Sequence, residues 1–183
     1  MTDLNLQLFH WINLGALAPA VLLGLARASS TVLPIVLVAG MVAASCWPDA
    51  RLRRALVVAF LAMLLAWLVS RGWSSAWPTP RPFVLGIGQQ WLEHRATPSF
   101  PSSHASVALA AGFALWRRLP HTVWRWLPLA LAALVAWSRV ALGLHFPFDV
   151  LAGAGVALVS GWLACRAMSL RGGDWVMARP APG

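Results

Sequence analysis

Residues 54–70 read RALVVAFLAMLLAWLVS, and every position between Arg54 and Ser70 is apolar. A helix needs about 20 predominantly apolar residues to cross about 30 Å of hydrocarbon, so this run predicts a membrane-spanning helix. Working outward from it, the apolar runs that predict spans are residues 5–27, 30–47, 54–70, 104–118, 124–138 and 148–166. We therefore expect an all-α membrane protein, a bundle of six transmembrane helices forming a single domain over residues 1–183.

Three of these expected spans have weaknesses. His10, Asn13 and Pro19 interrupt the first run, which could therefore lie partly in the membrane interface. The runs 104–118 and 124–138 are short for full spans. They must extend into their flanks or be sheltered by neighbouring helices.

The composition excludes an ordinary soluble domain, because 60% of the residues are hydrophobic, 10% are charged, and the mean hydropathy is +0.71. All 14 basic residues are arginine, and the formal net charge is +9. These arginines form short clusters between apolar runs, a pattern typical of loops that face anionic lipid. Since no interleaved aromatic and basic surface accompanies them, we expect membrane lipids as partners and no nucleic acid.

The placement of the arginines predicts the orientation of the chain. Nine of the 14 follow the second, fourth and sixth runs: Arg51, Arg53, Arg54, Arg117, Arg118, Arg125, Arg166, Arg171 and Arg179. By the positive-inside bias this side is cytoplasmic. The opposite side holds residues 71–103 and 138–149, so an active site there would face the periplasm of a bacterial inner membrane.

Three short clusters with chemical potential fall on this outer side: Arg81-Pro82-Phe83, Pro101-Ser102-Ser103-His104, and Ser138-Arg139 with His145 and Asp149. Ionisable groups beside a membrane are costly and tend to be functional. The serines of the second cluster open an apolar run, where free backbone N–H groups and the helix dipole favour an anion such as phosphate. Taken alone, that cluster is equally well explained as a helix cap with an unrelated histidine.

The third cluster predicts an oriented nucleophile. Pro147 is a preferred first helical residue, so Asp149 falls in the first turn and can reach back to His145. A carboxylate on one ring nitrogen fixes the tautomer and leaves the other nitrogen free to attack phosphorus. The alternative is a structural His–Asp pair that caps a helix.

Arg81 and Arg139 carry planar forks suited to phosphate oxygens, although lipid headgroup binding alone would also explain them.

Together these residues resemble the type 2 phosphatidic acid phosphatase superfamily over about residues 71–166, and the motif Ser138-Arg139-x5-His145-x3-Asp149 matches at each defining position. The resemblance implies that His145 is the nucleophile, Asp149 its partner and His104 the general acid. It further implies that Arg81, Arg139 and Ser102 hold phosphate. We add the adjacent Ser103 to this phosphate-binding set.

Two departures from the family pattern bear on the substrate. The family's first motif begins with a lysine where this chain has Ser74, so either Arg71 substitutes for it or the site works with one cation fewer. The segment from Arg81 through Trp91, His94 and Arg95 to His104 resembles the bacitracin-resistance class of undecaprenyl-diphosphate phosphatases, which also lacks the lysine. That class usually has aspartate at the place of Ser103. His94 and Arg95 are candidates for contacting a second phosphate.

The expected reaction is hydrolysis of undecaprenyl diphosphate to undecaprenyl phosphate and inorganic phosphate, with a phosphohistidine intermediate, as in recycling of a peptidoglycan carrier. We expect no cofactor and no metal, because the arginines supply the positive charge. The alternatives are a phosphatase or phosphotransferase acting on phosphatidylglycerol phosphate, phosphatidate or a lipid A phosphate. A lipid-phosphate binder or transporter is the alternative without catalysis.

Overall fold

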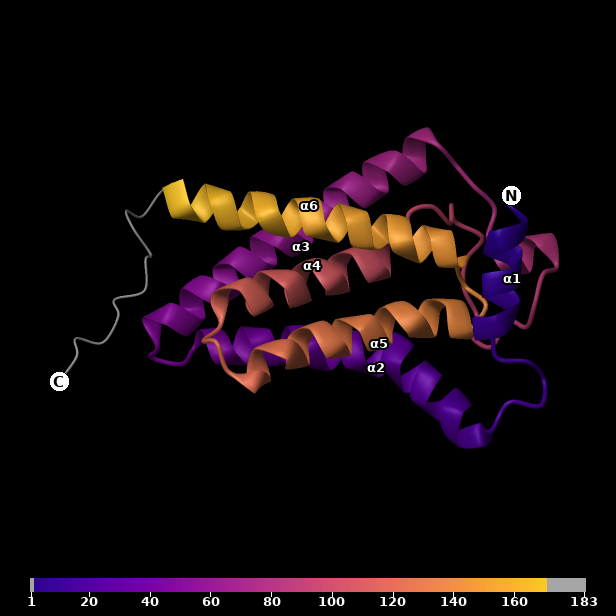
Figure 1. Ribbon diagram of the computed structural model, residues 1–183, viewed down its shortest axis with the longest axis horizontal. Coiled ribbons are helices and arrows are strands. Elements are labelled where there is room, and N and C mark those ends of the chain that lie inside the picture. Colours follow the sequence, from indigo (N-terminus) through magenta and orange to yellow (C-terminus); the bar gives the residue numbers. More distant parts are fainter. Residues whose placement is uncertain (1, 171–183) are drawn as a thin grey trace.

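The computed structural model describes residues 2–170, and all of their regular structure is helical (Figure 1). Its elements follow one another as α1 (Asp3–Ile12), α2 (Ala20–Ser45), α3 (Ala50–Ala76), η1 (Pro82–Leu85), α4 (Ser103–Arg118), η2 (Val123–Trp126), α5 (Leu127–Ala141) and α6 (Pro147–Leu170). The all-α membrane fold expected from the apolar runs is confirmed. Three of these helices, α2, α3 and α6, are long and apolar enough to cross a bilayer.

The helix boundaries follow from local sequence. Asp49 precedes α3, and its carboxylate accepts hydrogen bonds from the backbone N–H groups of Arg51 (2.7 Å) and Leu52 (3.3 Å). Pro82 and Pro147 stand at the first positions of η1 and α6, where the absent N–H costs no helical hydrogen bond.

Helix α4 lies at the centre of the bundle and packs against α3, α5 and α6, while α2 packs mainly against α5. Small side chains allow these close contacts: a Cβ atom added at Gly112 would lie 3.0 Å from the Pro128 carbonyl of α5, and one at Gly153 of α6 would lie 3.0 Å from the Ser102 carbonyl. A helix of 16 residues covers only about 24 Å. The shortness of α4 is therefore tolerated because its neighbours shelter it, as the sequence required.

The first expected span is wrong, and the second begins earlier than expected. Residues 5–27 do not form one span, because α1 has ten residues, covers only about 15 Å, and ends before Pro19. The second expected run began at Ser30, but α2 starts at Ala20 and continues through Ser29, Ser30 and Pro34. Both serines are buried, and the Ser30 hydroxyl bonds to Arg139, so these polar residues lie inside a helix.

The short helix α1 lies at the end of the bundle where α5 finishes and α6 begins (Figure 1). Phe9 is fully buried against Phe146, and Asn5 accepts a hydrogen bond from the Phe148 N–H at 3.0 Å. The described chain thus has five longer helices, and its N-terminal end lies on the same side as the loop between α3 and α4.

The arginine clusters gather at the other end of the bundle. Arg51 and Arg53 begin α3, Arg117 and Arg118 end α4, and Arg166 lies in the last turns of α6. Figure 1 shows these helix ends together, opposite α1. Arg171 and Arg179, which contributed to the predicted orientation, lie outside the described residues.

Candidate active site

His145 stands in the turn that joins α5 to α6, and the turn has a defined shape. Gly143 has a φ of +74°, and a Cβ atom there would lie 2.3 Å from the Gln89 carbonyl oxygen, so only glycine fits. The carbonyl of Arg139 accepts hydrogen bonds from the N–H groups of Leu144 (3.0 Å) and His145 (3.2 Å). This turn holds the imidazole almost fully buried, with 2% of its surface exposed.

The two ring nitrogens of His145 have different partners. Arg81 donates from Nη1 to Nε2 at 2.9 Å, which requires Nε2 to carry a lone pair. Nδ1 therefore carries the proton, and it lies 3.3 Å from the Ser99 hydroxyl and 3.5 Å from Oδ2 of Asp149. Burial, followed by the nearby positive charges of Arg81 and Arg139, lowers the pKa of His145 to about 4. At neutral pH the ring is uncharged, and its basic nitrogen is Nε2.

Asp149 is fixed behind His145 by the start of α6. Its Oδ2 accepts from the Phe146 N–H at 2.9 Å, as the third helical residue does in a capping box. Its backbone carbonyl accepts from the Ser102 N–H at 3.0 Å, which ties α6 to the beginning of α4. The sequence placed Asp149 in the first turn of a helix beside His145, and the structure brings the two together.

Arg81 is buried and held in a single orientation. Its guanidinium donates to the Thr97 carbonyl (2.8 Å), the Thr97 hydroxyl (3.2 Å), the Pro98 carbonyl (3.3 Å) and the Leu144 carbonyl (2.9 Å), in addition to His145. Burial lowers its pKa to about 10. Since this value is far above 7, Arg81 remains a cation at neutral pH.

Arg139 and Ser102 carry buried polar atoms without partners among the described residues. Arg139 is 2% exposed, and only its Nη1 is bonded, to the Ser30 hydroxyl at 2.5 Å. Its Nε and Nη2, and the hydroxyl of Ser102, have no hydrogen-bond partner. Leaving such groups buried and unsatisfied is costly. An anion with several acceptor oxygens would satisfy them.

The start of α4 adds further donors. Ser102 is the N-cap residue, but its hydroxyl makes no capping bond, contrary to the usual role of a serine there. Ser103 and His104 follow in the first turn, where backbone N–H groups lack intrahelical partners. Both side chains line a cavity of about 950 Å³.

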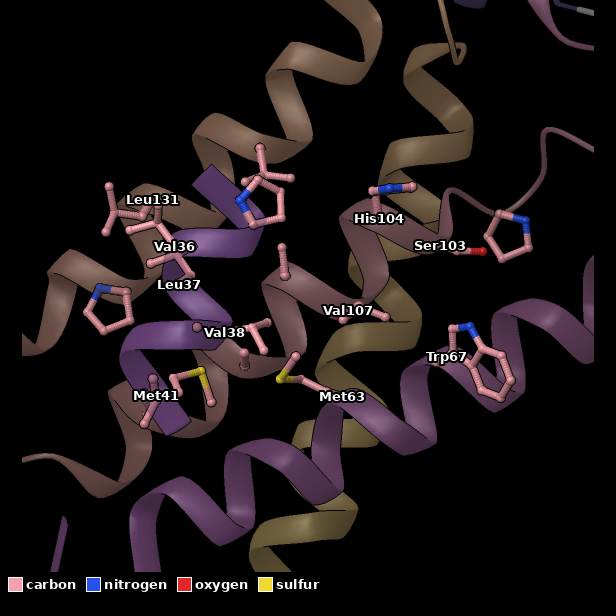
Figure 2. A pocket seen from close by; sticks show the side chains of 18 of the residues that line it. Val36, Leu37, Val38, Met41, Met63, Trp67, Ser103, His104, Val107 and Leu131 are labelled. Atoms are coloured by element: carbon pink, nitrogen blue, oxygen red, sulfur yellow. The ribbon is translucent and has the colours of Figure 1, made fainter. Parts of the chain in front are cut away.

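This cavity joins the polar site to an apolar interior. Its polar end is lined by Arg81, Ser103, His104 and His145, and its far end by apolar residues of α2 to α5 that include Met41 and Leu115. Figure 2 shows Ser103 and His104 at the wall of the cavity, with Val38, Met41 and Met63 farther along it. The arrangement suits a molecule with an anionic head and a long apolar tail.

The family model that describes the PAP2 superfamily matches residues 54–172, which is more than half of the chain. The chain belongs to the PAP2 superfamily. The resemblance drawn from its three motifs is thereby confirmed.

Similar proteins agree with this membership. YbjG from Escherichia coli (strain K12), provisionally named an undecaprenyl-diphosphatase, is 34% identical over 172 residues, covering 90% of this chain and 81% of that protein. Undecaprenyl-diphosphatase BcrC from Bacillus subtilis (strain 168) is 39% identical over 88 residues, which cover 48% of this chain and 44% of that protein. The crystal structure of Aquifex aeolicus LpxE has the same fold, with a TM-score of 0.77 at 21% identity over 90% of this chain and 96% of that one.

At the place of the PAP2 family's lysine, Ser74 is buried and donates its hydroxyl to the Phe100 carbonyl at 3.0 Å. It therefore holds the loop before α4 and offers no cation. Arg71, one helical turn earlier on α3, is exposed and lines the cavity. The structure thus brings a cation, Arg71, to the cavity wall.

The two candidates on the loop before α4 differ in position. His94 lines the cavity and donates from Nδ1 to the Arg95 carbonyl at 2.8 Å, which leaves Nε2 without a proton. Burial lowers its pKa from the ordinary value. The side chain of Arg95 is exposed and does not line the cavity. The structure brings Arg71 and His94 to the site, and it leaves Arg95 outside.

Three residues of this PAP2 site received no role from the sequence, although Thr97 and Ser99 lie in the segment that resembles the bacitracin-resistance class. Ser99 bonds to both Asp149 and His145, Thr97 accepts from Arg81, and Ser30 holds Arg139 from α2. Hydroxyl residues are common in loops and helices, so residue type alone does not single them out. For Thr97 and Ser99, the signal that could have found them was their place in that segment; Ser30 stood inside an expected apolar run, 30–47, and offered none.

Proposed function

We propose that this chain hydrolyses undecaprenyl diphosphate to undecaprenyl phosphate and inorganic phosphate through a phosphohistidine on His145. The observation that carries the proposal is the contact of this buried imidazole, which lines the cavity, with Arg81: the guanidinium Nη1 lies 2.9 Å from Nε2 and can only donate to it. The names of YbjG and BcrC support the choice of lipid.

In the first step, His145 Nε2 attacks the terminal phosphorus in line with the bridging oxygen of the diphosphate. The N–P bond forms as the bond from phosphorus to the bridging oxygen breaks, and His104 donates a proton to that oxygen. In the second step, His104 takes a proton from a water molecule, whose oxygen attacks the phosphorus. The N–P bond breaks as this O–P bond forms, its electron pair returns to Nε2 of His145, and inorganic phosphate is released. Location of both histidines on one cavity supports these roles.

The charge that builds up on the phosphoryl oxygens needs donors fixed before the reaction. Arg81, Arg139, Ser102, Ser103 and the free N–H groups of α4 are the groups that we assign to it. The free nitrogens of Arg139 and the free hydroxyl of Ser102 support this assignment. Arg81 would exchange its bond to Nε2 for bonds to phosphate oxygens when substrate enters.

We further propose that the reaction is independent of metal, since the guanidinium groups supply the positive charge. Residues 2–170 contain no group of three or more His, Cys, Asp or Glu side chains arranged to hold a metal ion. Activity is therefore expected to persist in strong chelators and to be inhibited by vanadate, which adopts the five-coordinate geometry of the transition state.

The remaining parts of the cavity suit the rest of the substrate. Its apolar part, bounded by α2 to α5, would take the first isoprene units of the tail. Arg71, at the polar end, would contact the phosphate that stays on the lipid. By the positive-inside bias, the arginine-rich end of the bundle is cytoplasmic, so the site faces the periplasm of an inner membrane.

The alternatives are a different lipid phosphate as substrate, or a lipid-phosphate binder or transporter without turnover. Binding alone would need the cations, but it gives no reason for an oriented His145 beside Asp149. Phosphate release by the purified protein separates turnover from binding.

Competition between undecaprenyl diphosphate and phosphatidate at equal surface concentration tests the substrate. We expect the diphosphate to be preferred and Arg71→Ala to reduce that preference about tenfold, because a monophosphate offers no second anionic group to this residue. Glu93→Gln, an exposed change on the loop before α4, is the matched control. A preference for phosphatidate, or an unchanged preference in Arg71→Ala, would remove the diphosphate assignment.

A further inference from the structure

We propose that Ser99 is a positioning residue that links the nucleophile to its carboxylate, so that His145, Ser99 and Asp149 work as a relay. The inference rests on the proposed function, because it concerns how His145 is prepared for attack. Ser99 opens the run Ser99-Phe100-Pro101-Ser102-x-His104, which carries the resemblance to the bacitracin-resistance class, but the sequence assigned it no role.

The distances show that Ser99 lies between the two groups. Its hydroxyl donates to Asp149 Oδ2 at 2.5 Å, and its oxygen lies 3.3 Å from His145 Nδ1. The direct separation of Nδ1 and Oδ2 is 3.5 Å, so the serine oxygen is the nearer of the two acceptors to Nδ1. Both contacts are longer than an ordinary N–H···O hydrogen bond of about 2.7–3.2 Å, and Nδ1–H is shared between the two oxygens. The carboxylate therefore acts on the imidazole partly through the serine oxygen.

The proton inventory gives the direction of each bond. An ionised carboxylate only accepts, so the single hydroxyl proton of Ser99 is directed to Asp149. The lone pairs of Ser99 Oγ then face His145, whose Nδ1 carries the proton because Nε2 accepts from Arg81. The contact of Arg81 with Nε2 and the contact of Ser99 with Nδ1 both require the proton on Nδ1. They therefore select the tautomer in which Nε2 is the nucleophile.

The backbone fixes Ser99 at this place. Its N–H donates to the Thr79 carbonyl at 2.9 Å, and the next N–H, of Phe100, donates to the Thr79 hydroxyl at 3.0 Å. The Phe100 carbonyl accepts from Ser74 at 3.0 Å. Ser99 is 1% exposed, so no solvent competes for its hydroxyl. Ser74, which stands where the family pattern has a lysine, therefore helps to hold the backbone next to Ser99.

The relay matters most after the N–P bond forms. The ring then carries positive charge, and Nδ1–H becomes a stronger donor. Ser99 can respond by polarising its own bond to Asp149, so the charge is shared without burying an unpaired imidazolium. Removing the hydroxyl should therefore slow the covalent step more than it weakens substrate binding.

The test compares Ser99→Ala with Ser106→Ala. Ser106 is a matched control, because it is also fully buried and its hydroxyl donates to a backbone carbonyl, that of Ser102, at 2.9 Å. We expect Ser99→Ala to lower kcat and the rate of phosphoenzyme formation about 10- to 100-fold with KM within about threefold. Ser106→Ala should keep kcat within about threefold of wild type.

A double-mutant cycle separates positioning from packing. If Ser99 acts through Asp149, the variant combining Ser99→Ala with Asp149→Asn should be within about threefold of Asp149→Asn alone. Losses that multiply would show that Ser99 contributes only packing, and they would overturn the inference. So would a kcat of Ser99→Ala that matches the Ser106 control.

Ser99→Cys guards against a variant that fails to fold. The thiol fills the space of the hydroxyl but is a weak donor, so we expect a folded protein with kcat between those of wild type and Ser99→Ala. A wild-type kcat in Ser99→Cys would contradict the relay. Failure of the proposed function would give another result than failure of the relay. In that case the wild-type protein would form no phosphoenzyme, and Asp149→Asn would not lower activity.

Discussion

At the scale of single residues, burial and charge place opposite requirements on the His145 ring. In the mechanism proposed above, His145 must be neutral to attack, and burial keeps it neutral by lowering its pKa to about 4. In that mechanism the ring then carries positive charge as a phosphohistidine, and Asp149 offers the compensating negative charge, directly and through the Ser99 hydroxyl. The cations Arg81 and Arg139 act in the opposite direction, because they oppose protonation of the ring and attract the phosphate.

This balance predicts a pH response. Arg81→Gln removes a positive charge that lowers the pKa of His145, so its titration should move upward from about 4 toward the ordinary 6.5. NMR of ¹⁵N-histidine-labelled protein in detergent, assigned with His145→Ala, measures the shift. Arg95→Gln serves as the control, since the Arg95 charge is not among those acting on His145. An unchanged or lower pKa in Arg81→Gln would refute the assigned electrostatics.

The same shift affects stability in a defined pH window. Between pH 6.5 and about 4, the unfolded chain takes up a proton at His145 while the folded chain does not. Stability from this residue is therefore complete above 6.5 and declines as the pH falls through the window.

At the scale of elements, the sequence predicted the helices that form independent apolar runs. The runs 54–70, 104–118 and 148–166 lie within α3, α4 and α6, and the run 124–138 lies within η2 and α5. In the N-terminal region, the first two runs were divided at residues 27–30, whereas α2 continues through this stretch. Ser30 of this helix is buried and bonds to Arg139, 109 residues away, and no local pattern reveals such a contact.

For the candidate site, the sequence predicted the main residues but not those that hold them in place. His145, His104, Arg81 and Ser103 do line one cavity, and Asp149 lies behind His145 as expected. Ser99 was missed because a serine carries no distinctive chemistry until its partner, 50 residues on, is placed beside it. The distinction between His94 and Arg95 likewise depends on which side chain the loop turns inward.

The helix α1 has a supporting role that Asn13 makes testable. The side chain of Asn13 donates to the carbonyls of Gln89 (3.0 Å) and Ala141 (3.1 Å) and accepts from the Gln89 N–H (2.8 Å). It therefore joins α1 and the loop before α4 to the His145 turn.

We expect Asn13→Ala to destabilise the protein by about 1–3 kcal/mol, because it removes these three hydrogen bonds, and to reduce turnover by loosening the turn. Thermal unfolding in detergent and phosphate release measure the two effects. Gln7→Ala, at an exposed position of α1, should change neither. If Asn13→Ala behaved like this control, α1 would have no part in holding the site.

At the scale of the whole molecule, the five longer helices change the predicted topology. Six spans would put the N-terminus on the arginine-rich side, whereas in the structure α1 lies at the end that carries His145. Cysteine labelling in intact cells, in a background without Cys46 and Cys165, distinguishes these topologies. We expect Gln7→Cys and Gln89→Cys to react with an impermeant reagent and Pro120→Cys to remain protected. Protection of Gln7→Cys with labelling of Gln89→Cys would restore the six-span topology.

The central claim is a covalent bond between phosphorus and His145, and rapid quenching tests it most directly. The enzyme would be mixed with undecaprenyl diphosphate labelled with ³²P in the terminal phosphate, stopped in alkali and digested for peptide mapping. The account predicts a base-stable, acid-labile label on the peptide that contains His145, formed as fast as turnover and absent from His145→Ala. Turnover with no label on that peptide, or label and turnover retained in His145→Ala, would contradict it.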